Sequence, residues 1–240
     1  MSSLIARVQT EQVPSTFERW WQIQGEWVEA PNQRRGGESG VQRLHSQSGR
    51  LLYLKRQTGH LHRSWLHPMG RPTALRELHA MQQLQRLGIR VPKLVYAAAQ
   101  KQAGQWRALL VTEALEGFVS LEQWYTSDAL RHGGTQLNRC MLEQLAAMLR
   151  RLHRAGWQHG CLYPKHIFIK PQAVADGGGV EVALLDLEKS RRRLFSRSAS
   201  RRDMGQLFRH RGGMPAADWQ LLLEAYNRSM ASVGAVCHEF

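Results

Sequence analysis

The chain has 240 residues, of which 42% are hydrophobic and 22% are charged, and its net charge is +14 at pH 7. This length and composition exclude an intrinsically disordered chain and predict a globular protein of one domain or two closely packed lobes. The excess of positive charge predicts an anionic partner, which leaves nucleic acid, an anionic membrane surface and phosphorylated small molecules open.

The cysteines and the apolar segments indicate where the protein works. Cys140, Cys161 and Cys237 are widely spaced, odd in number and without CxxC pairing. This pattern argues against a disulfide framework or a zinc site and fits a reducing cytosol. Residues 1–11 lack the apolar core of a signal peptide, and no stretch approaches the ~18 to 20 apolar residues of a membrane span. We therefore expect a cytoplasmic protein that reaches a membrane surface only through its charge.

A short helix and several strands are predicted first. The helix spans 14–21, and the strand-like segments are 25–30, 41–46 and 51–56. Between the first two strands, segment 34–40 reads Arg-Arg-Gly-Gly-Glu-Ser-Gly. A glycine turn lets backbone N–H groups approach phosphate oxygens, so this segment is a candidate phosphate loop. The alternative is an ordinary hairpin loop.

A lysine and a glutamate follow on neighbouring elements. Lys55 lies on the strand 51–56, on the face opposite Leu52 and Leu54. Glu77 lies beside the apolar stripe of an amphipathic helix at 71–88. Lys55 could neutralise nucleotide phosphates and pair with Glu77, as a lysine and a glutamate do in kinases. The alternatives are a solvated lysine and a helix carboxylate paired with a nearby arginine.

Two later strands, 91–96 and 108–113, complete a small antiparallel sheet. The segment 114–117 is then a natural linker, because the composition turns helical after it. A long helix at 137–155 has a broad apolar face and carries arginines near its C-terminal end, where they suit the helix dipole.

A polar loop at 159–169 and an apolar strand at 182–188 form the centre of the prediction. They have the layout of a kinase-like phosphotransfer centre, in which a loop handles the acceptor hydroxyl and a nearby carboxylate, here Asp186, holds the metal. One position departs from that layout. Where such loops carry an aspartate two residues after the histidine, this chain has Cys161.

A basic run and a pair of helices end the chain. The run at 189–202 reads KSRRRLFSRSASRR and contains no acid. Such a run is usually a flexible, solvated segment, but because it begins just after Asp186 it is also a candidate to collect an anionic acceptor. The helices are predicted near 203–210 and 216–230.

The order and spacing of these parts predict an α+β, two-lobed protein-kinase-like fold. The N-lobe, residues 1–116, would be a small antiparallel sheet with one helix and would carry the phosphate loop, Lys55 and Glu77. The C-lobe, residues 117–240, would be mainly helical and would carry the catalytic loop, Asp186 and the basic segment.

Three segments resemble one family more closely. The segments 20–32 and 34–41 and the run Tyr-Pro-Lys-His at 163–166 resemble the InaA-like branch of the lipopolysaccharide-core kinases, a family that includes the Kdo kinases and the WaaP heptose kinases. The resemblance implies transfer of phosphate from ATP, with Mg²⁺, to an inner-core sugar of bacterial lipopolysaccharide, either heptose or Kdo. It also implies an anionic glycolipid substrate and an anionic membrane surface as partners, at the cytoplasmic face of the inner membrane.

The resemblance implies a nucleotide site in the N-lobe, between the glycine segment and the hinge. The glycine segment would cover the phosphates, Lys55 would contact them, Glu77 would orient Lys55, and the hinge 113–115 would lie against adenine. The cofactor-binding residues are then Gly36, Gly37, Ser39, Gly40, Lys55, Glu77, Glu113 and Leu115.

The resemblance also implies the catalytic and metal-binding residues. Asp186 would bind Mg²⁺ and the phosphates, with His166 as a second metal-binding residue, and Cys161 would occupy the position of the catalytic base. Asp203 would support the loop from below. Leu187-Glu188 departs from the phenylalanine–glycine pair that usually follows the metal aspartate, a change we expect to affect regulation more than chemistry.

Cys161 leaves several functions open. An unperturbed thiol, with a pKa near ~8.5, is mostly protonated at neutral pH, and the loss of a general base costs on the order of 10²- to 10⁴-fold in rate. The chain is then a kinase of altered mechanism, a nucleotide-binding pseudokinase with a scaffolding or regulatory role, or a kinase that uses His159 or His166 as its base. A competing class is a non-enzymatic basic protein that binds RNA or an anionic membrane. Since no RNA-binding signature is present, we do not expect a nucleic-acid partner.

Overall fold

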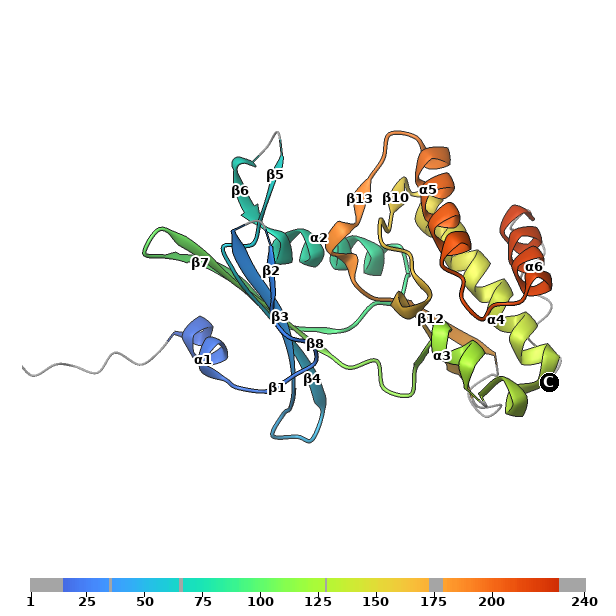
Figure 1. Cartoon of the computed structure of the whole chain (residues 1–240), viewed down its shortest axis with the longest axis horizontal. Helices are drawn as coiled ribbons and strands as arrows, with labels where there is room; N and C mark the ends of the chain where they lie inside the picture. The colour runs from blue at the N-terminus through green and yellow to red at the C-terminus, as the bar shows by residue number, and fades with distance from the viewer. Residues whose placement is uncertain (1–14, 35, 65–66, 128, 173–178, 229–240) are drawn as a thin grey trace, which may run out of the picture.

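The computed structural model describes residues 15–34, 36–64, 67–127, 129–172 and 179–228 (Figure 1). The elements of its N-lobe are α1 (Thr16–Gln22), β1 (Glu26–Trp27), β2 (Asn32–Arg34), β3 (Gly37–His45), β4 (Leu51–Thr58), β5 (Leu61–Ser64), β6 (His67–Pro72), α2 (Thr73–Arg86), β7 (Leu94–Gln102) and β8 (Gln105–Glu113). The elements of its C-lobe are β9 (Val119–Ser120), α3 (Leu121–Thr126), α4 (Ala129–Arg154), β10 (Trp157–Gln158), η1 (Pro164–His166), β11 (Ile167–Pro171), β12 (Val180–Leu184), η3 (Leu187–Lys189), β13 (Arg191–Arg192), α5 (Ser196–Arg209) and α6 (Ala216–Asn227).

The N-lobe is a six-stranded antiparallel sheet in the order β1-β3-β4-β8-β7, with β2 paired to β3. Alternate residues of a strand face opposite sides of the sheet. On β4, Leu52 and Leu54 pack in a small core with Phe17 of α1. Gln57 lies on the other side of the strand and hydrogen-bonds Thr73 at the start of α2. The same alternation turns Lys55 toward the α2 side, as its place in the sequence predicts.

A larger core joins the two lobes. Apolar residues of α2, such as Leu84, belong to the same buried cluster as Leu145 and Leu149 of α4 and Leu184 of β12. An isolated β-bridge between Arg90 and Ala183 adds a backbone link across the same boundary. In Figure 1, α2 accordingly lies between the sheet and the helices of the C-lobe.

The structure differs from the sequence-based prediction in several places, four of which affect the lobes most. The β5–β6 hairpin was not predicted, because its histidines, arginines and proline do not form an alternating apolar pattern. The segment that we predicted to be a glycine loop is mostly strand, since β3 begins at Gly37. The helix α4 begins at Ala129 and is broken at Gly134, whose φ of 66° and ψ of 179° are not helical. The helix α5 begins at Ser196, so the second half of the basic run is helical, with its arginines exposed.

The helices are also too short or too polar for a bilayer. Among the described residues, none is both long enough and apolar enough to cross a membrane.

Candidate active site between the lobes

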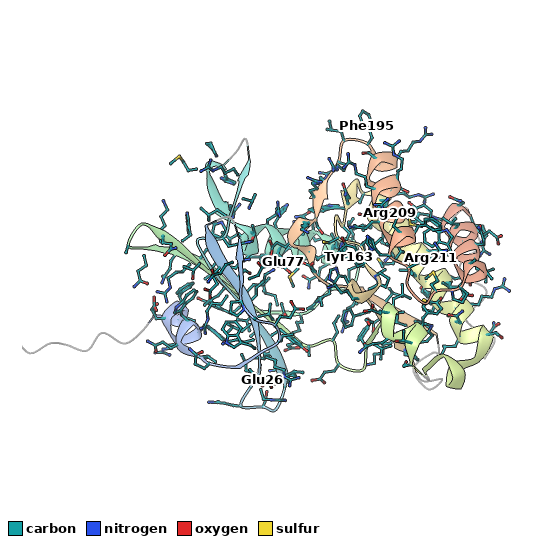
Figure 2. All side chains as sticks on the ribbon, viewed as in Figure 1. Glu26, Glu77, Tyr163, Phe195, Arg209 and Arg211 are labelled. Carbon is teal, nitrogen blue, oxygen red and sulfur yellow. The ribbon has the colours of Figure 1, made fainter. Side chains whose placement is uncertain are left out.

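Lys55 forms two ion pairs, one within the N-lobe and one with the C-lobe. Its Nζ lies 2.7 Å from Oε2 of Glu77 on α2 and 2.6 Å from Oε2 of Glu188 on η3. Burial alone would lower the pKa of Lys55, but the two carboxylates raise it above its ordinary value, so the ammonium stays charged. Figure 2 shows Glu77 at the boundary between the sheet and the helical lobe.

The sequence did not indicate the role of Glu188. Burial acts to raise its pKa, but Lys55 lowers the pKa below the ordinary value, so Glu188 is a carboxylate. Its backbone carbonyl also accepts a hydrogen bond from Nε of Arg76, at 2.5 Å. The only available signal was its position two residues after Asp186. The structure thus adds a contact of Glu188 with the site lysine, and the expectation that Leu187-Glu188 affects regulation more than chemistry stays a prediction.

Asp186 ends the β11–β12 hairpin in a left-handed backbone conformation, with φ of 56° and ψ of 62°. This conformation costs a residue with a Cβ on the order of 1 kcal/mol, and such strain is concentrated at functional sites. The side chain of Asp186 remains 36% exposed, and its Oδ2 lies 3.6 Å from Nε2 of His166. Its carboxylate is therefore open to a ligand that enters between the lobes.

His166 presents a defined ring nitrogen to Asp186. Its Nδ1 lies 2.8 Å from the backbone oxygen of Cys161, and because a carbonyl only accepts, Nδ1 carries the proton. Nε2 then faces the carboxylate of Asp186. A proton on Nε2 or a metal ion between the two groups makes this contact favourable.

Asp203, on α5, fixes the backbone of the catalytic loop. It is fully buried, and its carboxylate accepts hydrogen bonds from the N–H of His159 at 2.6 Å and of Gly160 at 3.0 Å. Nε2 of His153 lies 3.2 Å from the same carboxylate. The expected support of the loop by Asp203 is thus present, and His153, which the sequence did not single out, belongs to it.

His159 is a structural residue of the loop. Its Nδ1 accepts from the N–H of Cys161 at 3.2 Å, and its Nε2 donates to the carbonyl of Leu185 at 3.0 Å. Burial is the largest effect on this ring and lowers its pKa to about 4. A neutral imidazole with both nitrogens occupied cannot accept a substrate proton, so His159 is not the base.

Comparison with known proteins supplies the family. The family model described as the lipopolysaccharide kinase (Kdo/WaaP) family matches residues 18–226, a range that contains every site residue described above. This chain belongs to that family. Protein InaA of Escherichia coli (strain K12) is 42% identical over 210 residues, which cover 88% of this chain and 94% of InaA. The solved structure of WaaP in complex with acyl carrier protein matches with a TM-score of 0.66 at 24% identity, over 89% of this chain and 82% of that one. This match confirms the protein-kinase-like fold.

This member of the lipopolysaccharide kinase family departs from the kinase pattern at Cys161. The residue is 4% exposed, and burial, followed by the charge of Asp186, raises the pKa of its thiol above the ordinary value, although Lys189 acts in the opposite direction. The side chain is therefore a thiol at neutral pH and not a thiolate.

The donor atoms of Cys161, His166 and Asp186 lie within 4.8 Å of one another. Mg²⁺ prefers oxygen ligands and is commonly bound by one or two carboxylates together with substrate phosphates, whereas thiols and imidazoles suit softer ions. Asp186 therefore fits a magnesium ion that is shared with nucleotide phosphates. Cys161 does not fit as a magnesium ligand.

Close packing explains two of the glycines in segment 34–40. Gly36 lies at the turn between β2 and β3 with φ of 73°, and nothing would contact a Cβ there. A Cβ on Gly37 would lie 2.3 Å from the backbone of Gly59, and one on Gly40 would lie 2.4 Å from the ring of Trp27. The Ser39 hydroxyl accepts a hydrogen bond from Gln57 at 3.2 Å. Of the predicted phosphate loop, the turn around Gly36 is the open part; Arg35 lies outside the described residues.

The hinge offers backbone groups but not the side chain of Glu113. That carboxylate pairs with Arg50 and with Lys93, whose Nζ is 3.3 Å away. The carbonyl of Leu115 accepts from the N–H of Phe118 at 3.2 Å. Adenine recognition at 113–115 would thus depend on the remaining backbone groups.

Proposed function

We propose that this protein transfers the γ-phosphoryl group of ATP to a hydroxyl of an inner-core sugar, heptose or Kdo, of lipopolysaccharide at the cytoplasmic membrane face. The observation that carries the proposal is the convergence of Lys55 and Glu77 from the N-lobe on Asp186 and Glu188 from the C-lobe. Membership of the lipopolysaccharide kinase family supports the reaction class.

The site lysine would act as a fixed positive charge for the phosphates. Glu77 would keep Lys55 in place while Glu188 gives up its contact to the incoming phosphates. Mg²⁺, when bound at Asp186, supplies charge neutralisation for the transferring group. Phosphoryl transfer has a loose transition state in most analyses, so positioning and charge account for most of the catalysis. The turn at Gly36 would cover the phosphates from the N-lobe.

His166 is the group that we assign to the acceptor proton. The thiol of Cys161 has a raised pKa and His159 has both ring nitrogens occupied, whereas His166 turns Nε2 toward Asp186. Metal binding at the same nitrogen would exclude this role, because a coordinated nitrogen has no lone pair for a proton. If Nε2 of His166 is the base, metal in excess of that needed at Asp186 should slow the transfer. If Nε2 is a metal ligand, excess metal should not slow it.

A nucleotide-binding pseudokinase is the second candidate, and the buried thiol of Cys161 favours it. The two functions share a nucleotide site and differ in phosphate transfer. A thermal shift with ATP and Mg²⁺ tests the shared part, because a ligand that binds only the native state raises its stability. Lys55→Met should abolish the shift, whereas Lys101→Met, on an exposed strand end, should retain it. The absence of a shift in the wild-type protein at millimolar nucleotide would contradict both functions.

Transfer itself is tested with γ-labelled ATP and purified lipopolysaccharide inner core. We expect label in the sugar fraction, loss of label with Asp186→Ala, and a smaller change with Cys161→Ala. If Asp186→Ala matches the wild-type rate, the metal assignment is wrong. If the wild-type protein shows a thermal shift but incorporates no label above background, the pseudokinase is the better description.

We also propose that the loop between β13 and α5 touches the membrane surface. Leu194 and Phe195 are 97% and 73% exposed, and Arg191, Arg192 and Arg197 beside them are exposed as well. Apolar side chains among basic ones are typical of segments that enter the interface of an anionic bilayer. In Figure 2, Phe195 lies at the outer edge of the C-lobe.

A further inference from the structure

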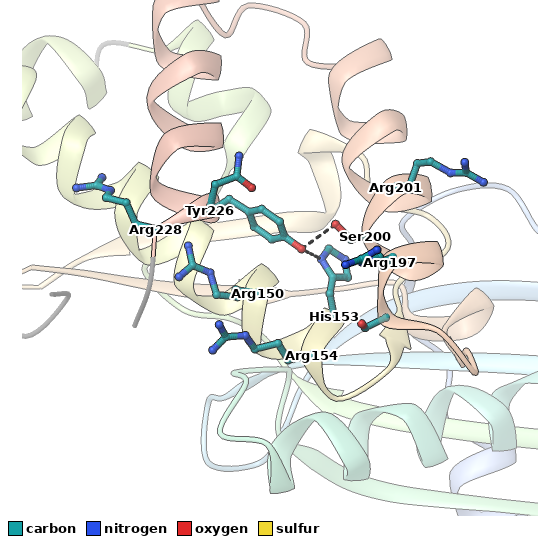
Figure 3. Close-up of a pocket in the computed structure, with 10 residues that line it drawn as sticks. Arg150, His153, Arg154, Arg197, Ser200, Arg201, Tyr226 and Arg228 are labelled. Carbon is teal, nitrogen blue, oxygen red and sulfur yellow. Dashed lines mark hydrogen bonds between the residues drawn. The ribbon is translucent and has the colours of Figure 1, made fainter. Parts of the chain in front are cut away.

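An arginine-lined pocket lies in the C-lobe, apart from the proposed nucleotide site. A pocket of roughly 540 Å³ opens between the end of α4, the start of α5 and the end of α6 (Figure 3). None of its lining residues is acidic. The arginines that line it are Arg150, Arg154, Arg197, Arg201 and Arg228.

The charge of these arginines is little compensated inside the protein. Arg150 is 5% exposed, and its guanidinium donates to the backbone carbonyl of Ala225. Arg228 reaches a carboxylate, that of Glu143, only at 3.5 Å. Within the described part of the chain, Arg154, Arg197 and Arg201 have no carboxylate within ion-pair distance. Guanidinium groups that line one pocket favour an anion that more than one of them can bind.

The start of α5 adds a second feature that suits an anion. Ser196 and Arg197 belong to the first turn of this 14-residue helix and line the pocket, and no side chain caps that end. The free N–H groups of a first turn and the helix dipole favour negative charge there. A phosphate matches this combination, because its oxygens accept from forked guanidinium groups and from backbone N–H groups together.

The pocket is connected by hydrogen bonds to the catalytic loop. The hydroxyl of Tyr226, in the pocket wall, lies 2.8 Å from Oγ of Ser200 and 2.8 Å from Nδ1 of His153, and Figure 3 draws both contacts. The opposite nitrogen of His153 contacts Asp203, which holds the N–H groups at the start of the loop. A ligand that shifts α5 or α6 therefore acts on the residue that fixes the catalytic loop.

We propose that this arginine pocket binds a phosphate-bearing anion other than the nucleotide, and that its occupancy stabilises the catalytic loop through His153 and Asp203. The binding is independent of the proposed kinase function. Only the effect on catalysis rests on it. The phosphate is either soluble or part of a lipid headgroup, since Ser196 directly follows the exposed pair Leu194 and Phe195.

Calorimetric titration with pyrophosphate tests the binding. We compare the wild-type protein with the double variant Arg197→Gln/Arg201→Gln and with the control Arg202→Gln/Arg209→Gln, which removes the same charge from exposed positions of α5 outside the pocket. Loss of two charge-assisted contacts should weaken pyrophosphate binding by about tenfold or more in the pocket variant, with little change in the control. Equal affinities, or equal losses in both variants, would overturn the proposal.

Two further measurements separate this site from the nucleotide site and identify the source of the phosphate. The pocket variant should keep its thermal shift with ATP and Mg²⁺; loss of that shift together with pyrophosphate binding would overturn the proposal that the two sites are separate. Binding to phosphatidylcholine vesicles with and without phosphatidic acid identifies the source. If the phosphate belongs to a lipid headgroup, the pocket variant should lose its preference for vesicles with phosphatidic acid. If the phosphate is part of a soluble anion, the pocket variant should keep that preference.

Hydrogen exchange tests the connection to the loop. Pyrophosphate should slow exchange of the amides of His159 and Gly160 in the wild-type protein and leave them unchanged in the pocket variant. Unchanged exchange in a wild-type protein that binds pyrophosphate would overturn the coupling and leave the binding site intact.

Discussion

Oε2 of Glu188 lies 2.6 Å from Nζ of Lys55, the ammonium that Glu77 holds from the other side. A carboxylate of the C-lobe therefore occupies a contact that phosphates would make in the proposed nucleotide site. In that proposal, nucleotide binding would displace it.

Replacing Glu188 should therefore strengthen nucleotide binding. We expect Glu188→Gln to lower the dissociation constant for ATP by about tenfold, because a charge-assisted hydrogen bond worth roughly 1.5–3 kcal/mol no longer has to be broken. Calorimetry with ATP and Mg²⁺ measures the effect. Glu181→Gln, on β12, is the control. Weaker binding in Glu188→Gln would instead make Glu188 a ligand of the nucleotide or its metal.

Restoring a carboxylate in the catalytic loop should raise the rate of transfer. Because the pKa of the Cys161 thiol is raised, it is a poor base, and Cys161→Asp adds a second candidate base beside His166. Transfer should increase, with the ~10²- to 10⁴-fold of a general base as the upper limit. The label-transfer assay measures it, with Cys140→Ala as the control cysteine variant. An unchanged rate would indicate that His166 already removes the acceptor proton or that proton removal does not limit the proposed transfer.

His159 should make stability depend on pH in a narrow acidic window. Burial lowers its folded pKa to about 4 from an ordinary value near 6.5, so the neutral form is favoured by folding. Its contribution is fully present above pH ~6.5 and is lost as the pH falls from ~6.5 to ~4, by roughly 3 kcal/mol.

Urea unfolding at a series of pH values measures this contribution. His159→Gln should have a flatter dependence of the free energy of unfolding on pH across that window. His45→Gln, at an exposed strand end, should follow the wild-type curve. Parallel curves for all three proteins would contradict the assignment of His159 as a buried neutral ring.

The loop before α5 should determine vesicle binding. Leu194→Ser/Phe195→Ser should lower flotation with anionic vesicles several-fold, because the apolar side chains that enter the interface are lost while the arginines remain. Met69→Ser is the matched control, since Met69 is 87% exposed on the N-lobe. Flotation that falls equally in both variants, or in neither, would place the membrane contact elsewhere.

The parts of the site that the sequence predicted are those with a local pattern. Lys55 was predictable from strand alternation, Glu77 from its place beside a helical stripe, and Asp186 from the apolar strand before it. Glu188 and His153 were not, because their roles come from contacts between segments far apart in the chain. The start of α5 was not predicted, because its many basic residues obscure the helical spacing of the buried ones. The buried residues of α5 are Ala199, Asp203, Met204 and Leu207.

The attachment of α2 to the C-lobe limits how this protein can be switched. Arg76 binds the carbonyl of Glu188, and Leu84 is fully buried in the core that continues into α4. Outward swinging of this helix would break that contact and open the main core. Because α2 is held by the sheet through the Gln57–Thr73 hydrogen bond as well as by the C-lobe, its displacement would break contacts with both lobes, and we expect it to keep its place while the turn at Gly36 moves.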